Sequence, residues 1–186
     1  MKTTAYIGTS LDGFIARQDG DISWLEKFAD EDFFRAYDAF MDRIDAIVIG
    51  RGTFEKVLTF PTWPYRKKVF VLSSSLGQVP DNLKERVTII FLEPVALLRS
   101  LSGNGFSRVC LDGGKVVQSF LKADLIDELI ISRVPVLIGR GIPLFGDLDT
   151  DRSFRHIRTE SYPNGLIRSQ YEKTDFTGAA GSEDKQ

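Results

Sequence analysis

The chain has 186 residues and a formal net charge of −2, with 42% hydrophobic and 27% charged residues. This length suits one domain with a full core, and the composition argues against extended disorder. The charge balance gives no general attraction to nucleic acid or to an anionic membrane. The same balance is compatible with a local basic pocket.

Cysteine and histidine occur once each, as Cys110 and His156, which excludes an intramolecular disulfide and a Cys- or His-rich metal cluster. Cys110 lies in an apolar run and is expected to be a small buried hydrophobe. The N-terminus enters a strand pattern without a basic segment and an apolar cleavable core, and no apolar stretch is long enough to span a bilayer. These features predict a cytoplasmic protein without a metal ion.

Strand-like and helix-like segments alternate along the chain, which is typical of an α/β domain. The expected strands are 3–8, 46–49, 68–72, 87–91, 108–111, 125–132, 154–161 and 166–174. The expected helices are 30–43, 53–58, 93–101 and 116–121. Asn164-Gly165 favours a tight antiparallel hairpin between the last two strands. Residues 1–174 are expected to form the domain, and 175–186, rich in Gly, Ala, Ser and charge, a disordered tail.

Two short runs each join an apolar strand to a glycine turn and then to a helix start. They contain Gly50-Arg51-Gly52-Thr53 and Gly113-Gly114-Lys115-Val116. Glycine lets the backbone approach a phosphate closely, and the helix start offers unpaired N–H groups with positive dipole character. The two runs predict two halves of one nucleotide site, although turns of this kind also occur as plain structure.

The order of these segments resembles the dihydrofolate reductase fold, an α/β fold whose mixed, mostly parallel central sheet is flanked by helices and ends in an antiparallel hairpin. The loop Ser10-Leu11-Asp12-Gly13-Phe14-Ile15-Ala16, followed by Gly20 and Ser23-Trp24, is similar to the C-terminal reductase domain of bacterial riboflavin-biosynthesis deaminase-reductases. The resemblance covers residues 1–174 and rests on four motifs in the same order. The zinc-deaminase signature is absent from the sequence, so a stand-alone reductase is expected.

The resemblance implies NADPH as the cofactor. In this fold an arginine after the first glycine and a serine pair after the next strand hold the adenosine 2′-phosphate, which here implies Arg51 with Ser73 and Ser74. The same serines would also suit an ordinary polar strand end. The pyrophosphate would lie between the two helix starts. The implied cofactor-binding residues are Gly50, Arg51, Gly52, Thr53, Ser73, Ser74, Gly113, Gly114, Lys115 and Val116.

The resemblance also implies a non-proline cis peptide bond between paired glycines, for which Gly113-Gly114 is the candidate. Such a bond persists only where the surrounding fold enforces it, because it costs about 3–4 kcal/mol. A trans Gly-Gly turn is the alternative.

By its spacing to Gly50, Asp32 falls nearest to the carboxylate that dihydrofolate reductases place under the substrate ring. It is the implied catalytic residue, which would hydrogen-bond an aminopyrimidine and help deliver a proton. Asp12 and Trp24 are the substrate-binding candidates. Acids at a helix start also serve as plain caps, and a tryptophan also serves as a core residue.

These inferences predict an NADPH-dependent reductase of a small heteroaromatic substrate, similar to the 5-amino-6-(5-phosphoribosylamino)uracil reductase of riboflavin biosynthesis. A dihydrofolate reductase and a non-catalytic NADPH-binding module are the alternatives. Residues 60–66, Phe-Pro-Thr-Trp-Pro-Tyr-Arg, depart from the Asp-x-Pro-x-Leu segment that helps those enzymes to hold a phosphosugar arm. A homodimer is also expected, with the apolar segment Leu129 to Ile138 as a sheet-edge contact.

Overall fold

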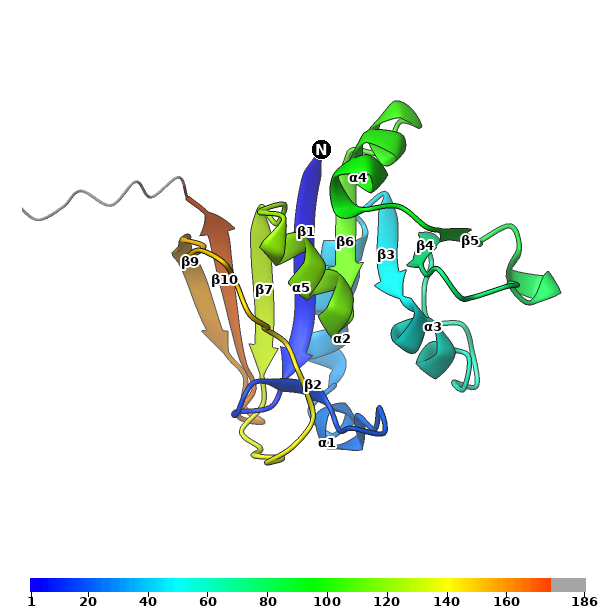
Figure 1. The fold of residues 1–186 in the computed structure, drawn as a ribbon. Coiled ribbons are helices and arrows are strands. Elements are labelled where there is room, and N and C mark those ends of the chain that lie inside the picture. Colours follow the sequence, from blue (N-terminus) through cyan, green and yellow to red (C-terminus); the bar gives the residue numbers. More distant parts are fainter. Residues whose placement is uncertain (175–186) are drawn as a thin grey trace, which may run out of the picture.

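One large sheet forms the centre of the structure (Figure 1). Its strands are β1 (Lys2–Thr9), β3 (Ala46–Gly50), β4 (Lys68–Leu72), β5 (Val87–Ile90), β6 (Arg108–Asp112), β7 (Glu128–Arg133), β9 (Phe154–Ser161) and β10 (Ile167–Lys173). They lie in the order β5-β4-β3-β6-β1-β7-β10-β9. The computed structural model describes residues 1–174, so the expected tail over 175–186 lies outside the described residues.

Five helices and a small ribbon accompany the sheet within residues 1–174. The helices are α1 (Ser23–Glu26), α2 (Glu31–Met41), α3 (Arg51–Val57), α4 (Pro94–Gly103) and α5 (Gly114–Lys122), with a 3-10 turn, η1 (Asp81–Leu83). The ribbon pairs β2 (Phe14–Ala16) with β8 (Ile142–Pro143) in antiparallel fashion. The long predicted strands and helices are all present, whereas these short elements carry too few residues to show a period in the sequence.

The central strands are buried on both faces because helices cover both sides of the sheet. In β3, Ala46 and Val48 pack into one core cluster with residues of α4 and α5, and Ile47 and Ile49 pack into a second with residues of α2 and α3. Figure 1 shows α4 and α5 in front of the sheet and α2 behind it. We call these the α5 face and the α2 face. A continuous apolar run is what such a two-sided strand requires.

The strands from β5 to β7 run parallel, and their C-terminal ends therefore meet at one edge of the sheet. In Figure 1 this is the lower edge, where α1 and β2 also lie. The glycine turns after β3 and β6 are neighbours there, since Ile49 pairs with Asp112.

The C-terminal hairpin breaks the parallel scheme as predicted. Its turn uses Gly165 at φ +90°, a backbone conformation that glycine adopts without strain. The hairpin returns antiparallel to β7, so β7 is hydrogen-bonded on both sides, by β1 and by β10. The prediction that Leu129 to Ile138 supplies a sheet edge was therefore wrong; the edges are β5 and β9.

A cap joins the start of α2 to this hairpin. The Asp30 side chain accepts a hydrogen bond from the Phe33 N–H at 3.0 Å, which satisfies one of the free donors at the helix start. Asn164, in the hairpin turn, donates to the second Asp30 oxygen at 2.9 Å and to the Phe28 carbonyl at 3.0 Å. The start of α2 is thereby held beside the hairpin.

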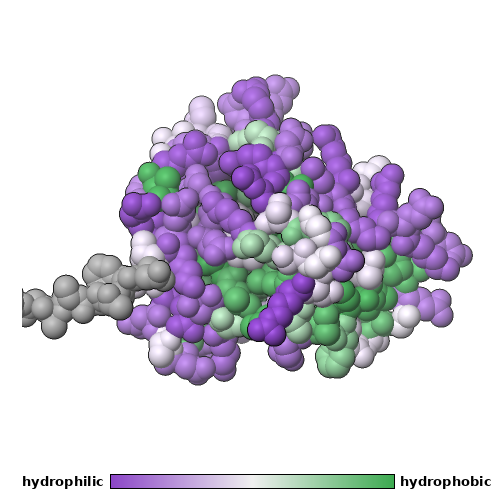
Figure 2. Space-filling view, turned by 90° about the horizontal axis from the view of Figure 1, so that it is seen from above, coloured by the Kyte–Doolittle hydropathy of each residue, from purple (hydrophilic) through white to green (hydrophobic). Residues whose placement is uncertain are grey.

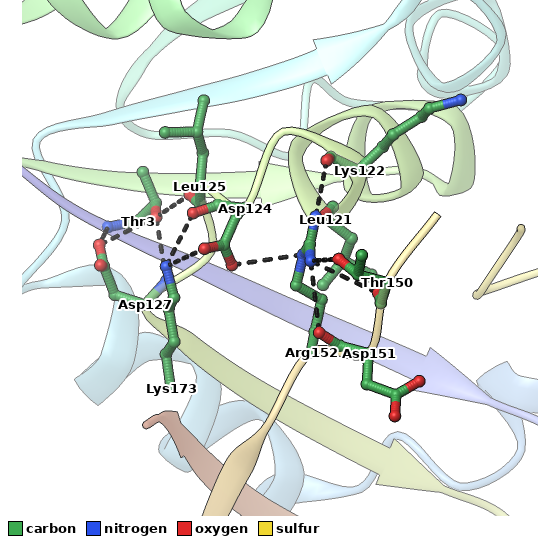
Figure 3. Close-up of polar contacts among 10 residues, drawn as sticks. All are labelled: Thr3, Leu121, Lys122, Asp124, Leu125, Asp127, Thr150, Asp151, Arg152 and Lys173. Carbon is green, nitrogen blue, oxygen red and sulfur yellow. Dashed lines mark hydrogen bonds and ion pairs between the residues drawn. The ribbon is translucent and has the colours of Figure 1, made fainter. Parts of the chain in front are cut away.

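Figure 3 shows a polar junction at the C-terminal end of α5. Arg152 donates to the carbonyl oxygens of Leu121 and Lys122, each at 3.1 Å, and Lys173 donates to the Asp124 carbonyl at 2.9 Å. The Asp124 carboxylate pairs with both cations, at 3.4 and 2.8 Å. Cations complement the negative end of a helix dipole. The junction thus anchors α5 at the end opposite to its glycine turn.

Among residues 1–174, no helix combines the length and the apolar character that crossing a membrane requires.

Candidate functional site

The two glycine turns meet in the structure. A Cβ atom on Gly113 would lie 2.3 Å from the Thr53 Oγ1 atom, and one on Gly50 would lie 3.4 Å from a Val116 methyl group. Gly113 also has φ +92°, so a side chain there would be strained as well as blocked. The structure therefore brings the two predicted runs together, with the glycine backbone of each run facing a side chain of the other.

Two helices begin at this point without a side-chain cap. Gly50 is the N-cap of α3 and Gly113 that of α5, and neither start receives a capping hydrogen bond from a side chain. The first N–H groups of both helices are therefore available to an anion, with the positive ends of the dipoles behind them. Arg51, Gly52 and Lys115 are exposed at these starts.

The side chain of Val116 is turned away from this opening. It is 3% exposed and belongs to the core cluster on the α5 face. Because Val116 lies in the first turn of α5, its backbone N–H could still bind a ligand, whereas its side chain could not.

The expected cis bond between Gly113 and Gly114 is absent, and that prediction was wrong. Gly113 instead adopts φ +92° and ψ 142°, which turns the end of β6 into α5 through a trans peptide bond. The trans Gly-Gly turn, which was the alternative, is the one observed, and the conformational freedom of glycine allows it.

The β2–β8 ribbon covers the start of α5. A Cβ on Gly114 would lie 3.1 Å from both the Ile15 Cδ1 atom and the Pro143 carbonyl oxygen. Ile7 of β1 packs in one cluster with Val116 of α5. Thr9 is two positions further along β1, so its side chain points to the same face of the sheet. The Thr9 hydroxyl is buried and has no hydrogen-bond partner among the described residues. A buried polar atom without a partner, on the face of the sheet that α5 covers, suits a polar ligand.

Arg51 lies beside the serine loop that follows β4. Its Nη1 donates to the Ser75 Oγ at 2.9 Å, and its Nε pairs with Glu55 at 2.6 Å. The Ser73 hydroxyl oxygen accepts the N–H groups of Ser75 and Leu76, at 3.2 and 2.9 Å. Ser74 is exposed. The predicted arginine and serine loop are therefore neighbours, but the serine that contacts Arg51 is Ser75, while Ser73 shapes the turn.

A carboxyl that the sequence analysis did not select lies at the end of β6. Asp112 immediately precedes Gly113, and its Oδ2 accepts a hydrogen bond from the Tyr65 hydroxyl at 2.8 Å. Burial raises the pKa of the Asp112 carboxyl above its ordinary value of 3.8, and the bonds from Tyr65 and the Gly113 N–H oppose that effect. Burial, with Asp112 next to it, raises the pKa of Tyr65 well above 10.0.

Aromatic side chains surround this pair on the α2 face. Trp63 meets Tyr65 edge-on, with ring centroids 5.4 Å apart, and meets Phe54 of α3 at 6.1 Å. Burial raises the pKa of Tyr37 on α2, and nearby Cys110 and Asp112 add to the effect. Thus residues 60–66, the segment that departs from the family pattern, deliver the hydrogen-bond partner of Asp112.

The structure places Asp32 on the first turn of α2, exposed and paired with Arg35 at 2.8 Å. No contact between Asp32 and either glycine turn is present among the hydrogen bonds and ion pairs of residues 1–174. Its role in proton delivery stays a prediction.

Asp12 and Trp24 both make structural contacts. The Asp12 carboxylate accepts hydrogen bonds from the Ser10 hydroxyl at 2.6 Å and from the N–H groups of Gly139 and Ile138 at 2.8 and 3.3 Å. The Ser10 bond in particular holds the pKa of Asp12 below 3.8. Trp24 is 4% exposed and packs in a core cluster with two other buried residues, Val134 and Leu166. Substrate contact by either residue stays a prediction.

Comparison with known proteins identifies relatives over nearly the whole domain. A family model described as the RibD C-terminal domain matches residues 2–168. YwjB, an uncharacterized protein of Bacillus subtilis (strain 168), is 39% identical over 165 residues, which cover 87% of this chain and 92% of that protein.

Solved structures share the fold. A Shewanella sp. PV-4 protein assigned provisionally to riboflavin biosynthesis superposes with a TM-score of 0.86 at 39% identity, over 94% of this chain and 99% of that one. A pyrimidine reductase-like protein from Corynebacterium diphtheriae gives a TM-score of 0.70 at 18% identity, over 93% and 92% of the two chains. The Thermotoga maritima deaminase/5-amino-6-(5-phosphoribosylamino)uracil reductase gives 0.74 at 19% identity, over 93% of this chain and 56% of that enzyme.

Proposed function

Because the chain belongs to the RibD C-terminal domain family, we propose that it is an NADPH-dependent reductase of a small pyrimidine-type heterocycle. The family is one of NADPH-dependent reductases with a dihydrofolate reductase-like fold. The observation that carries the proposal is the meeting of the uncapped first turns of α3 and α5, where Thr53 lies against Gly113, beside an arginine and a serine loop. The proposed substrate class draws support from the pyrimidine reductase-like relative.

The residues at the glycine turns fit NADPH. The N–H groups that open α3 and α5 would hold its pyrophosphate, and Gly113 lets Thr53 of one run pack directly against the backbone of the other. Arg51 and the serine loop would hold the 2′-phosphate, because a guanidinium forms charge-assisted bonds with phosphate. The Thr9 hydroxyl would partner a polar group of the cofactor. When bound, NADPH supplies the hydride for the reduction.

A proton must accompany the hydride, and two carboxyls of this chain compete for that role. Asp112 is half-buried and hydrogen-bonded to Tyr65, and desolvation raises its pKa, so it retains a proton more readily than an ordinary aspartate. Asp32 is exposed and paired with a cation. We propose Asp112 as the group that holds the proton, with Asp32 as the alternative.

The test is NADPH oxidation by the full chain, followed at 340 nm against a panel of substrates. Turnover of 5-amino-6-(5-phosphoribosylamino)uracil or a related pyrimidine is the expected result. Turnover of dihydrofolate alone would favour a dihydrofolate reductase. NADPH binding by titration without oxidation across the panel would favour a non-catalytic module, and a failure to bind NADPH would refute the cofactor assignment.

We also propose a homodimer. Several large apolar side chains of the described chain are exposed, among them Phe91 at 75% and Leu137 at 69%. Figure 2 shows that hydrophobic residues gather in a band across a face that is otherwise mostly hydrophilic. Apolar surface of this kind is typical of interaction sites. Sedimentation at micromolar concentration should give about twice the chain mass of 20.9 kDa; particles of a single chain, with the tail intact, would contradict the proposal.

A further inference from the structure

A groove lies on the α2 face of the sheet, between α2 and the last two strands. It has a volume of about 350 Å³. Tyr6 of β1, Ile130 of β7 and Phe40 of α2 form its apolar part, and Arg158, Glu160, Arg168 and Gln170 of β9 and β10 line it from the other side. A volume near the lower end of the ordinary ligand-site range suits a small molecule.

The groove exists because α2 has small residues where it faces β9 and β10. Ala36 and Ala39 line it, and each contributes only a methyl group. Larger side chains at these two positions would fill the space above Gln170. The opening is therefore a consequence of the sequence of α2 and not of a missing element.

The lining of the groove is strongly cationic. Arg43, Arg158 and Arg168 bring three positive charges, whereas Glu160 brings one negative charge, so the lining carries +2 in a chain of net charge −2. Glu160 is already shared, since it pairs closely with Arg168 and at 3.4 Å with Arg158. Arg43 has no carboxylate within ion-pair distance in residues 1–174. An anion would complete this set of charges.

The guanidinium groups lie against aromatic rings. The Arg43 guanidinium carbon is 5.9 Å from the Phe40 ring centroid, and that of Arg168 is 5.3 Å from the Tyr162 centroid. The Tyr6 and Phe40 rings are 4.9 Å apart, and the Tyr6 hydroxyl accepts a hydrogen bond from Arg168 at 3.2 Å. Planar cations beside aromatic surface suit a ligand that combines a flat apolar body with a carboxylate or phosphate.

We propose that this groove is a second binding site, for a small aromatic anion that carries a carboxylate or a phosphate group. Arg43, which has no ion-pair partner among residues 1–174, is the first residue to meet the anionic group, and Arg158 is the second, because it is 60% exposed whereas Arg168 is 11% exposed and held by Tyr6 and Glu160. The aromatic body occupies the apolar part of the groove, which the largely buried Tyr6 and Phe40 line together with Ile130. The site is separate from the glycine turns, and the proposal does not depend on the reductase activity.

Direct binding to the full chain tests the site, with benzoate and phenyl phosphate as probes and neutral benzyl alcohol as the comparison, by calorimetry without NADPH. We expect saturable binding of at least one anion, at least 10-fold tighter than the alcohol. Arg43→Gln and Arg158→Gln should each weaken that binding at least 10-fold without changing NADPH affinity. Both side chains are exposed, so the variants should fold.

Arg155→Gln is the matched control. Arg155 is an exposed arginine of the same strand, β9, that pairs with Glu172 and does not line the groove. Its loss should leave anion binding within twofold of the parent. Absence of saturable binding up to 10 mM of either anion would overturn the proposal. Equal losses from Arg155→Gln and Arg43→Gln would also overturn it, since they would indicate general surface charge. A change in sedimenting mass of the Arg43 variant would instead assign the groove to contact between copies.

Discussion

Two carboxyls on the α2 face of this protein accept hydrogen bonds from side chains, yet their pKa values move in opposite directions. Asp112, at the end of β6, is bonded to the neutral Tyr65 hydroxyl, and burial raises its pKa. Glu160, on β9, is bonded to the Arg168 guanidinium, which lowers its pKa. The difference lies first in desolvation, which dominates at Asp112, and then in the counter-charge, because the Tyr65 hydroxyl only partly opposes that effect whereas the Arg168 guanidinium outweighs it at Glu160.

This difference separates two kinds of site. Around Asp112, desolvation favours the protonated carboxyl next to the Gly113 turn, and this suits a step that moves a proton. The region of Glu160 keeps fixed charges around a small groove, which suits recognition of an ion. Single substitutions in the two regions test whether Asp112 serves proton transfer and whether Glu160 serves as a fixed charge.

The largest expected effect concerns the proton. Asp112→Asn keeps a group that can accept the Tyr65 hydrogen bond, so the variant should fold and bind NADPH, while turnover falls by roughly 10²–10⁴-fold because a positioned proton donor is lost. Asp32→Asn is the matched variant and should retain turnover within a few fold. NADPH oxidation and NADPH titration on both variants provide the measurements. The reverse pattern, with Asp32→Asn inactive and Asp112→Asn active, would restore Asp32 as the proton donor.

The glycine turn next to Asp112 supplies a stability test. Gly113→Ala should lower the free energy of unfolding by more than the roughly 1–3 kcal/mol that a positive φ alone costs, because its Cβ would also meet the Thr53 hydroxyl at 2.3 Å. Gly139→Ala is the control, with φ +73° and nothing within 4 Å of its Cβ. Adding Thr53→Ala to Gly113→Ala should recover part of the loss. Urea unfolding curves measure all three. Equal losses at the two glycines would show that the turns do not press against each other.

Much of this region could be predicted because its signals are local. The apolar run of β3, its glycine turn and the Asn164-Gly165 hairpin each specify structure within a few residues, and all three appear as expected. The position of Gly113 beside Thr53 followed from the ordinary rule that parallel strands end at one edge.

The remainder depends on contacts between distant segments. Tyr65 and Asp112 are 47 positions apart, and nothing in residues 60–66 indicates which strand end they reach. A polar residue at the end of the buried run before Gly113 was the one available signal for Asp112. The burial of β7 as an interior strand depends on where the hairpin docks, which the hairpin sequence does not encode locally. Contacts between segments far apart in the sequence therefore explain why Tyr65 and Asp112 were missed and why the sheet edge was predicted wrongly.

Cofactor discrimination is the next effect in size. Arg51→Ala should weaken NADPH binding by about 1.5–3 kcal/mol, roughly 10- to 150-fold, because a charge-assisted bond to the 2′-phosphate is lost. NADH binding should change little, so the preference between the two cofactors should collapse. Arg99→Ala, which removes an exposed arginine from α4, is the control and should alter neither affinity. Equal weakening of both cofactors by Arg51→Ala would assign Arg51 to the pyrophosphate or to the structure of the serine loop.

The smallest effect tests the opposite pKa directions themselves through the pH dependence of stability. Glu160 has a lowered pKa in the folded protein, so its contribution is present above its ordinary value of 4.5 and is lost as the pH falls through the lower, folded value. The parent should therefore be more stable than Glu160→Gln at pH 7, by about 0.2–1 kcal/mol for a partly exposed pair, and this advantage should vanish in acid. Asp112 has a raised pKa, so the protein loses stability as the pH rises from 3.8 through the folded value. Asp112→Asn removes that loss, and its stability relative to the parent should rise between pH 4 and pH 7. Urea unfolding of the parent and both variants across this range measures the two slopes, and slopes of the same sign would refute the distinction between the two carboxyls.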